Sequence, residues 1–298
     1  MKKGSYEMNK VIKNDLVVAE IKTLGAEVVS FKRLENGCEY MWSGDEKLWN
    51  GKAPVLFPNV CAVNNGEIKV DGEIYKLGNH GFARKSEFEL VEETDTKAVY
   101  KLSYNEDTLK MYPFKFNLFI TYTVDGNKLN IEYKVENVDD KDMYFQIGTH
   151  PGFNCPLDKE SKFEDYYLEF ECNETLERLF MNDANVLINN KSEVILENNN
   201  ILPITRELFK DGALVFKNMN SKQVALKSKT SDKTVTLSYN DLTYMGLWQA
   251  KTADFVCIEP WHGIADTDGY TGEFKDKEMI ITLEKGSSYK CDYTIEIK

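Results

Sequence analysis

The stretch FNLFITYTVDGNKLNIEYKV, residues 116–135, alternates apolar and polar side chains with a period of two. Successive side chains of a β-strand point to opposite faces, so this alternation predicts strands with one buried face. Asp125-Gly126 interrupts the alternation, and this dipeptide supplies the positive φ values that tight hairpin turns require. We therefore predict a long antiparallel hairpin over this stretch.

The same period of two recurs elsewhere in the chain. It is found in the opening segments 16–21 and 27–31, in the runs 224–226 and 235–239 on either side of Thr230–Lys233, and in the final residues 293–297. These segments predict further strands, the second pair forming another hairpin.

Helical signals are few and short. Residues 45–49 and 205–209 each allow about one helical turn, and Asn198-Asn199-Asn200 predicts a loop. No long segment has apolar residues at helical spacing, which argues against a parallel α/β architecture. The sequence therefore predicts an all-β fold, a large antiparallel β-sandwich with few short helices. No linker or composition break is present, so we expect a single domain over residues 1–298.

The charge balance restricts the partners of this chain. Its 298 residues include 37 Lys and Arg against 49 Asp and Glu, a formal net charge of −12. Proteins bind nucleic acid through clustered cations, whereas this surface repels phosphates on average, so we expect no nucleic-acid partner. An anionic ligand would need a local basic pocket.

Neither the apolar pattern nor the cysteines indicate a membrane or secreted protein. No apolar run reaches the ~18 residues that span a bilayer, and residues 1–7 are not followed by a signal-type hydrophobic stretch. The six cysteines include no C-x-x-C pair and are predicted to be buried thiols rather than disulfides. We therefore expect a cytoplasmic protein with no membrane partner.

Three segments depart from the strand alternation, and together they hold all three histidines of the chain. Each joins its histidine to Gly or Pro: Gly78-Asn79-His80-Gly81-Phe82-Ala83-Arg84, Gly148-Thr149-His150-Pro151-Gly152-Phe153-Asn154 and Cys257-Ile258-Glu259-Pro260-Trp261-His262-Gly263. Glycine permits close approach and proline fixes the chain direction, so each segment presents its histidine from a defined position. Each could instead be a turn histidine satisfied by neighbouring backbone, but three together favour a shared site.

Glu259 is the carboxylate best placed to act with a histidine. It follows the apolar run 255–258 and precedes Pro260, so we expect it to be partly desolvated. Imidazole titrates near neutrality and burial raises a carboxyl pKa towards it, so the two groups can serve as acid and base on one substrate. The alternative is a structural glutamate that caps a turn or pairs with a lysine.

Other chemistries lack a motif in this chain. The histidines are about 70 and 110 residues apart, without the paired spacing of zinc motifs, so no metal site is predicted. The G-x-S-x-G elbow, the Walker loop and the dinucleotide fingerprint are also absent from the sequence.

In this order and at these separations, the three segments resemble the aldose 1-epimerase (galactose mutarotase-like) superfamily, most closely its LacX-like and hexose-6-phosphate mutarotase branch. Two further stretches look like landmarks of that branch, Ala53-Pro54-Val55-Leu56-Phe57-Pro58 and Gly246-Leu247-Trp248. The resemblance spans roughly residues 15–295. It implies a large antiparallel β-sandwich, in agreement with the alternation.

The resemblance implies interconversion of the α and β anomers of an aldohexose, without a cofactor or a metal. It makes His150 the general acid, which donates to the ring oxygen, and Glu259 the general base, which takes the proton of the anomeric hydroxyl. His80 and Asn154 would bind the substrate. Trp248 would supply an aromatic platform for the sugar.

Arg84 and Lys52 bear on whether the sugar is phosphorylated. In the phosphosugar branch an arginine after the His-Gly motif contacts the phosphate, which implies this role for Arg84. Asn50-Gly51-Lys52 replaces that branch's Arg-Gly-Gly, so Lys52 would take over a basic contact. Cys61-Ala62 stands where mutarotases commonly carry an arginine, which leaves open a free hexose or its 6-phosphate. His262 matches no catalytic position and is expected at the rim or in a structural role.

Two other functions stay open at this point. One is a non-catalytic sugar-binding or sensor protein on the same fold, motivated by the altered Cys61-Ala62 segment. The other is a glycoside hydrolase or lyase, which would need a second carboxylate about 5–10 Å from Glu259. In each case the partner is a small-molecule sugar or sugar phosphate, and the chain is expected to be a monomer or a homodimer.

Overall fold

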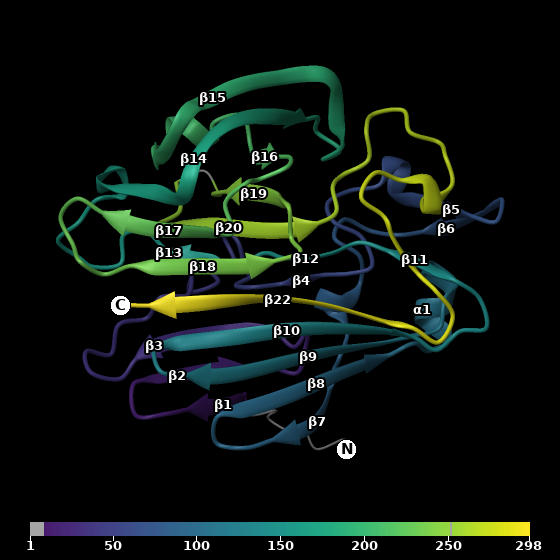
Figure 1. Ribbon diagram of the computed structural model, residues 1–298, viewed down its shortest axis with the longest axis horizontal. Coiled ribbons are helices and arrows are strands. Elements are labelled where there is room, and N and C mark those ends of the chain that lie inside the picture. The colour runs from purple at the N-terminus through teal and green to yellow at the C-terminus, as the bar shows by residue number, and fades with distance from the viewer. Residues whose placement is uncertain (1–8, 251) are drawn as a thin grey trace.

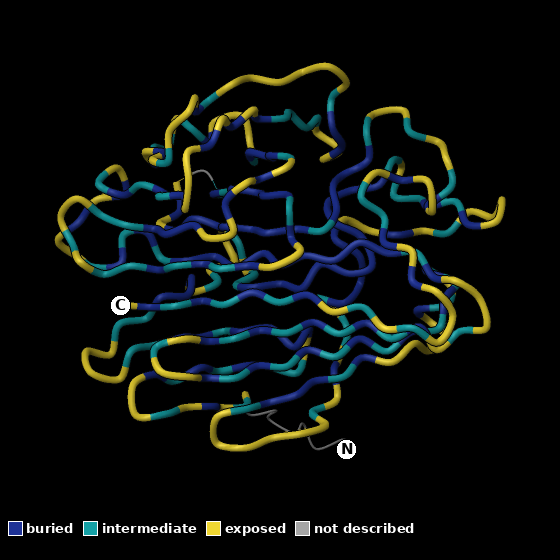
Figure 2. The backbone as a smooth tube through the Cα atoms, viewed as in Figure 1, coloured by how far each residue is buried: buried dark blue, intermediate teal, exposed yellow. Residues whose placement is uncertain are grey.

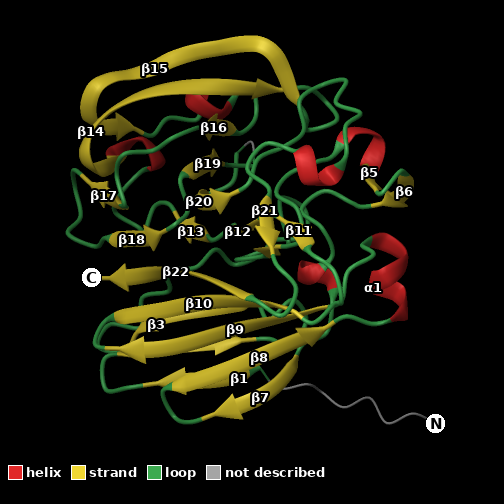
Figure 3. Cartoon of the chain, turned by 45° about the vertical axis from the view of Figure 1, so that its right-hand side comes forward, coloured by secondary structure: helices red, strands yellow, loops and turns green. Residues whose placement is uncertain are grey.

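The computed structural model describes residues 9–250 and 252–298, so the N-terminal segment 1–7 considered above lies outside it. Strands make up 51% of the structure and helices 7%, which confirms the predicted all-β fold (Figure 3). Within the described residues no helix is both long enough and apolar enough to cross a membrane.

Fifteen strands form one antiparallel sheet that extends through both halves of the molecule (Figure 1). These strands are β4 (Val55–Leu56), β7 (Glu89–Glu93), β8 (Lys97–Ser103), β9 (Phe116–Asp125), β10 (Lys128–Asn137), β12 (Ile147–Thr149), β13 (Gly152–Asn154), β14 (Tyr166–Met181), β15 (Leu187–Pro203), β16 (Leu214–Phe216), β17 (Gln223–Ser228), β18 (Val235–Asn240), β19 (Tyr244–Trp248), β20 (Phe255–His262) and β22 (Ser288–Ile297). The hydrogen-bonded order is β4-β12-β20-β19-β16-β14-β17-β18-β22-β10-β9-β8-β7, with β13 attached to β20 and β15 to β14.

A second, three-stranded sheet packs against β8 and β9. Its strands are β1 (Lys10–Lys13), β2 (Val17–Ile21) and β3 (Val28–Arg33). Two buried tyrosines join the layers. The Tyr100 hydroxyl donates to the Ile21 carbonyl at 3.4 Å, and the Tyr122 hydroxyl donates to the Ala26 carbonyl at 2.6 Å. This pairing of layers is the sandwich that the alternation predicted.

The remaining elements are short and lie around the two layers. They are the hairpin β5 (Glu67–Val70) and β6 (Glu73–Lys76), the pair β11 (Met143–Phe145) and β21 (Ile281–Leu283), helix α1 (Glu106–Met111) and the 3₁₀ helices Asn64–Gly66, Ala83–Lys85, Phe163–Asp165, Glu207–Phe209 and Phe274–Asp276.

The hairpin predicted over residues 116–135 is confirmed as β9 and β10. Along both strands, buried positions alternate with more exposed ones, as the apolar pattern requires (Figure 2). The turn lies one residue later than Asp125-Gly126, because Asp125 still pairs with Lys128. Gly126 alone of the predicted dipeptide has a positive φ, 57°.

The other predicted strands are also confirmed. The runs 224–226 and 235–239 pair as β17 and β18, with Val224 opposite Leu237. The two opening segments form β2 and β3, and the C-terminal alternation forms β22. Strand β1 had no counterpart among the predictions, and neither did β4–β8, β11–β16 and β19–β21.

The prediction of a loop at Asn198-Asn199-Asn200 is wrong, because these residues belong to β15. Asn199 pairs with Glu174 of β14 at a point where the register of the ladder shifts. Asn198 has a φ of 43°, and asparagine tolerates this left-handed conformation better than most residues. The strand therefore bulges here and continues.

The short helical predictions are partly confirmed. Residues 205–209 contain the 3₁₀ helix Glu207–Phe209, whereas residues 45–49 form a hydrogen-bonded turn without a helix. Helix α1 was not predicted. Asn105 caps it by accepting from the Thr108 amide at 2.9 Å, while the Thr108 hydroxyl accepts from the Asn105 amide at 2.8 Å. This reciprocal capping box is local enough to start a short helix in an otherwise strand-rich chain.

All six cysteines are free thiols, as predicted, but two of them are not buried. Cys38 is half-buried and Cys172 is exposed on β14. Cys172 lies in a stretch of β14 whose neighbouring positions are also exposed, so its thiol is not part of the core.

Tyr122→Phe is expected to lower the free energy of unfolding by about 1–3 kcal/mol, because the Ala26 carbonyl would lose a buried hydrogen bond between the layers. Denaturant unfolding of the variant and the wild type measures this difference. Tyr104→Phe, at an exposed ring, is the control and is expected to change stability by under about 0.5 kcal/mol. Equal stability of all three proteins would contradict the prediction.

Candidate active site

The antiparallel ladder between β20 and the short strands β12 and β13 places His150 opposite Glu259. The pairs on either side of these two residues are Gly148 with Trp261 and Gly152 with Cys257. His150 is midway between the two glycines and Glu259 is midway between their partners. Cross-strand neighbours have Cβ atoms about 4.5–5.5 Å apart, so the imidazole and the carboxylate meet.

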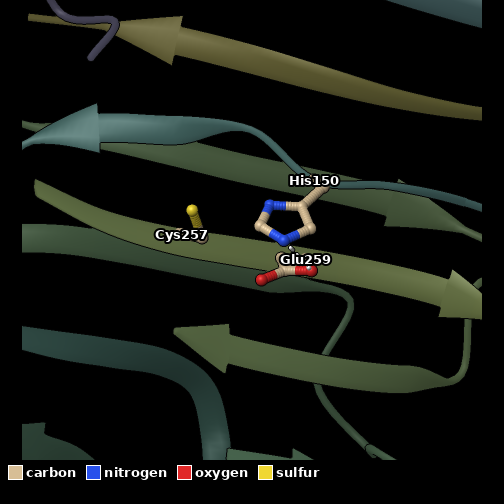
Figure 4. Close-up of side chains that lie close together, drawn as sticks. All are labelled: His150, Cys257 and Glu259. Carbon is tan, nitrogen blue, oxygen red and sulfur yellow. Dashed lines mark ion pairs between the residues drawn. The ribbon is translucent and has the colours of Figure 1, made fainter. Parts of the chain in front are cut away.

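The two side chains form a buried pair. His150 Nε2 lies 3.3 Å from Glu259 Oε2, and the side chains are 11% and 3% exposed. Figure 4 shows the imidazole reaching from the connection between β12 and β13 towards the carboxylate on β20. Two of the three histidine segments therefore converge as the sequence led us to expect.

Burial shifts the pKa values of the two groups in opposite directions. It raises the pKa of Glu259 well above its usual range. It lowers the pKa of His150 to about 3, and the positive charge of Arg84 acts in the same direction. Both shifts favour uncharged groups. The surroundings therefore hold both groups towards their neutral forms.

His80 faces His150 and is held in one tautomer. The two ring centroids are 5.6 Å apart. The Cys61 amide donates to His80 Nδ1 at 3.0 Å, so the ring proton is on Nε2. The His80 amide donates back to the Cys61 carbonyl at 2.9 Å, and both residues have left-handed backbone, with φ of 61° and 57°. This reciprocal contact fixes His80 as an N–H donor of the site.

A cavity of about 250 Å³ contains the pair. Its walls combine aromatic, polar and small side chains: Trp49, Pro54, Cys61, Asn79, His80, Arg84, His150, Met181, Asn185, Ala213, Trp248, Glu259 and Trp261. A separate cavity of about 120 Å³ beside β5 contains none of the histidines and is not part of this site.

Two tryptophans flank the imidazole of His150. Its ring centroid lies 5.0 Å from Trp49 and 5.7 Å from Trp248, and the two indoles meet edge to face at 5.4 Å. The structure therefore places Trp248 in the cavity, as the resemblance implies, and adds Trp49 beside it. Aromatic faces of this kind pack against the C–H groups of a small polar ring.

Trp261 lies beside Glu259, and two glycines on neighbouring strands leave room for its indole. A Cβ at Gly148 would lie 2.6 Å from Trp261 Cδ1, and one at Gly246 would lie 2.3 Å from Trp261 Cζ2. Any larger residue at either position would displace the ring. Trp261 Nε1 is buried without a hydrogen-bond partner among the described residues.

Arg84 brings a positive charge to the cavity wall. Its Nη2 donates to the Asn79 carbonyl at 3.0 Å, and its Nε is buried without a partner in the described part of the chain. Burial lowers the pKa of Arg84, and the charge of Glu27 opposes this shift. No ion pair to Arg84 occurs within residues 9–250 and 252–298, so its charge is free for a ligand.

Three other residues singled out in the sequence do not line the cavity. Lys52 Nζ donates to the Val29 carbonyl at 3.0 Å, and Asn154 Nδ2 donates to the Glu39 carbonyl at 2.9 Å. The structure does not bring Lys52 or Asn154 to the cavity, and their binding roles stay predictions. His262 Nδ1 lies 3.1 Å from the Asp241 carbonyl, a structural contact outside the cavity.

One group of side chains has the donor atoms of a metal site. The ligand atoms of His150, Cys257 and Glu259 all lie within 4.8 Å of one another, and all three residues are buried (Figure 4). The sequence spacing gives no sign of this group, because His150 lies in the β12–β13 connection and the other two lie on β20, and only the fold brings them together.

Sequence reasoning assigned roles to five of the thirteen residues that line the cavity and none to the other eight, among them Trp49, Trp261 and Cys61. Trp49 was considered only as part of a helical turn, Trp261 only as part of a motif, and Cys61 only as a replacement. The position of Trp261 two residues after Glu259 was a usable signal, since residues i and i+2 of a strand share a face. Trp49 and Cys61 come from loops, and no sequence period indicates where loop side chains point.

This cavity, with a buried imidazole–carboxylate pair, a fixed N–H donor and aromatic walls, is typical of a protein that acts on a small polar ligand. The comparisons with known proteins agree. The aldose 1-epimerase family model matches residues 9–282. Protein LacX of Lactococcus lactis subsp. lactis is 31% identical over 300 residues, 96% of this chain and 98% of that protein.

Solved structures show the same relationship. A galactose mutarotase related enzyme from Lactobacillus acidophilus superposes with a TM-score of 0.93 at 33% identity, covering 98% of this chain and 97% of that one. A galactose mutarotase-like protein from Lactobacillus casei gives 0.91 at 31% identity, covering 97% and 100%. The chain belongs to the aldose 1-epimerase family and is an isomerase of the mutarotase type.

His80 is expected to be neutral at pH 5.5 with its proton on Nε2. Burial lowers its pKa well below 6.5, helped by His150 and Arg84, so the ring stays neutral where a free histidine would be charged. Nitrogen-15 NMR of the three imidazoles reports both the charge and the tautomer. A His80 signal that titrates near pH 6.5, or one with the proton on Nδ1, would contradict this geometry.

Proposed function

We propose that the protein interconverts the α and β anomers of an aldohexose, with His150 as general acid and Glu259 as general base. The observation that carries the proposal is the buried pair, 3.3 Å apart in a cavity of about 250 Å³. The names of the relatives make galactose the first sugar to test.

The distance between the two groups suits the reaction. Ring opening needs a proton delivered to the ring oxygen and another removed from the anomeric hydroxyl. Both oxygens are bonded to the same carbon, so the acid and the base must be close neighbours. His150 Nε2 and Glu259 Oε2 meet this requirement, and acid–base help of this kind typically contributes ~10²–10⁴-fold.

The proton balance closes within the pair. The proton of the pair first passes from Glu259 Oε2 to His150 Nε2, 3.3 Å away. The resulting imidazolium gives this proton to the ring oxygen as the bond from the anomeric carbon breaks. The Glu259 carboxylate takes the hydroxyl proton, and the electrons of that O–H bond form the carbonyl. After rotation about the bond to C2, closure on the other face reverses both transfers. The pair starts and ends with one proton.

The buried surroundings favour the opening step. Opening converts a charged imidazolium and carboxylate into a neutral imidazole and a carboxylic acid. Burial lowers the pKa of His150 and raises that of Glu259, so it stabilises the arrangement that opening produces. The His80 Nε2–H group supports the proposal as a donor to a sugar oxygen, and Trp49 and Trp248 as apolar walls for the ring.

The alternative of a glycoside hydrolase receives no support from the cavity. That reaction uses two carboxylates on either side of the scissile bond. Among the described residues that line the cavity, Glu259 is the one carboxylate.

His150→Asn and Glu259→Gln are each expected to lower kcat/KM for anomer exchange by ~10²-fold or more, because each removes one partner of the proton exchange. NMR exchange or polarimetry on freshly dissolved α-D-galactose measures the rate. His262→Asn is the matched control, since this histidine lies outside the cavity, and it is expected to keep the wild-type rate. Near-normal exchange in folded His150→Asn would sink the assignment. A wild type that binds sugar without accelerating exchange would favour a sensor.

We further propose that Arg84 binds an anionic group of the substrate, as in a hexose 6-phosphate. The guanidinium lines the cavity without an ion pair in the described residues, and its Nε is buried without a partner. A phosphate dianion would supply both the charge and the acceptor oxygens that are missing. The cation must come from this residue, because Lys52 points to the Val29 carbonyl.

Arg84→Ala is expected to reduce kcat/KM for a hexose 6-phosphate at least ~10-fold more than for the free hexose, because the lost contact is to the phosphate. An anomer-exchange panel of free hexoses and their 6-phosphates measures both losses. Lys85→Ala, which removes the neighbouring exposed charge, is the control. Equal losses on the two substrates would show that Arg84 does not recognise phosphate.

A further inference from the structure

Cys257 is a buried thiol next to the acid–base pair, and the proposed reaction does not use it. It precedes Glu259 by two residues on β20, so both side chains are on the same face of the strand, with Cys257 fully buried behind the cavity wall. Its Sγ, His150 Nε2 and a carboxylate oxygen of Glu259 lie within 4.8 Å of one another (Figure 4). Cys61, a second buried thiol, lines the same cavity.

This set of donor atoms matches one class of ligand. Thiolate sulfur and imidazole nitrogen favour zinc and related thiophilic ions over magnesium or calcium, which prefer oxygen. Three protein ligands leave a fourth tetrahedral position open, and here that position would face the cavity. Around a tetrahedral ion with bonds of about 2.0–2.3 Å the donor atoms are ~3.5 Å apart. His150 and Glu259, 3.3 Å apart, already meet this spacing, so the Cys257 sulfur would have to approach them by about 1 Å.

We propose that His150, Cys257 and Glu259 bind a thiophilic divalent metal ion, of which Zn²⁺ is the type, and that this ion excludes the sugar from the site. The exclusion of the sugar rests on the proposed function. The ion would occupy the lone pairs of His150 Nε2 and a Glu259 carboxylate oxygen, which are the two atoms that exchange protons with the sugar. The binding itself does not depend on that function.

The ion can replace two protons of the site without changing its net charge. The ion brings two positive charges, the Cys257 thiol gives up one proton and the His150–Glu259 pair gives up the other. Both protons leave to solvent, and the buried site keeps its net charge. Metal binding to protonated ligands generally releases protons in this way.

Cobalt(II) titration of the metal-free protein tests the site directly. One Co²⁺ per chain is expected, with the visible absorption of a tetrahedral centre and a sulfur-to-cobalt charge-transfer band in the near ultraviolet. Cys257→Ser is expected to remove the charge-transfer band and to weaken Zn²⁺ binding, measured by calorimetry, by at least ~10-fold. Cys172→Ser removes the exposed thiol instead and is expected to bind as the wild type does.

Anomer exchange in the presence of Zn²⁺ provides the second measurement. Zn²⁺ is expected to inhibit competitively with sugar, and a chelator is expected to restore the rate. Absence of the charge-transfer band, or a band that survives in Cys257→Ser and disappears in Cys172→Ser, would overturn the metal site. A wild type that shows the band with Co²⁺ but, when metal-free, accelerates no exchange would overturn the proposed function and leave the metal site standing.

Discussion

The antiparallel register between β20 and the strands β12 and β13 is the constraint on which the rest of the site depends. It places His150 across from Glu259, and β19 holds the other side of β20 with Gly246 opposite the same carboxylate. A shift of one residue would turn every side chain of β20 to the other face. Ile258 or Pro260 would then meet His150, and Glu259 would point away from the cavity. The fifteen-stranded sheet therefore sets the chemistry as well as the shape.

Burial of Glu259 is tolerated because the group need not be charged. An isolated ionised carboxylate costs several kcal/mol when it is removed from water, and a buried group avoids this cost by keeping its proton. The raised pKa of Glu259 and the lowered pKa of His150 express the same environment. That environment also suits the proposed reaction, since a proton held between two groups that both prefer neutrality can be passed to a substrate and returned.

The sequence predicted the parts of the structure that depend on local pattern. The alternation over residues 116–135 identified the β9–β10 hairpin because burial follows that pattern residue by residue. The three asparagines at 198–200 misled the prediction, since pairing with β14 outweighs their preference for loops. The pairing of His150 with Glu259, which are far apart in the sequence, was predicted from the order of the motifs. The directions of Lys52 and Asn154 depend on carbonyl groups of Val29 and Glu39, which no local pattern reveals.

A site that exchanges protons between nitrogen and oxygen also presents the lone pairs that a metal ion would take, so the fold must favour one use over the other. In this cavity the distinction depends on protons. Burial and the neighbouring Glu259 raise the pKa of the Cys257 thiol, so an ion that binds the sulfur must displace its proton. The proton shared by His150 and Glu259 occupies the remaining donors. The register that aligns the pair also brings the thiol to the same face, two residues earlier on β20. The low polarity around these three groups, to which the flanking rings of Trp49 and Trp248 contribute, therefore makes both proposed uses of the site depend on where its protons are.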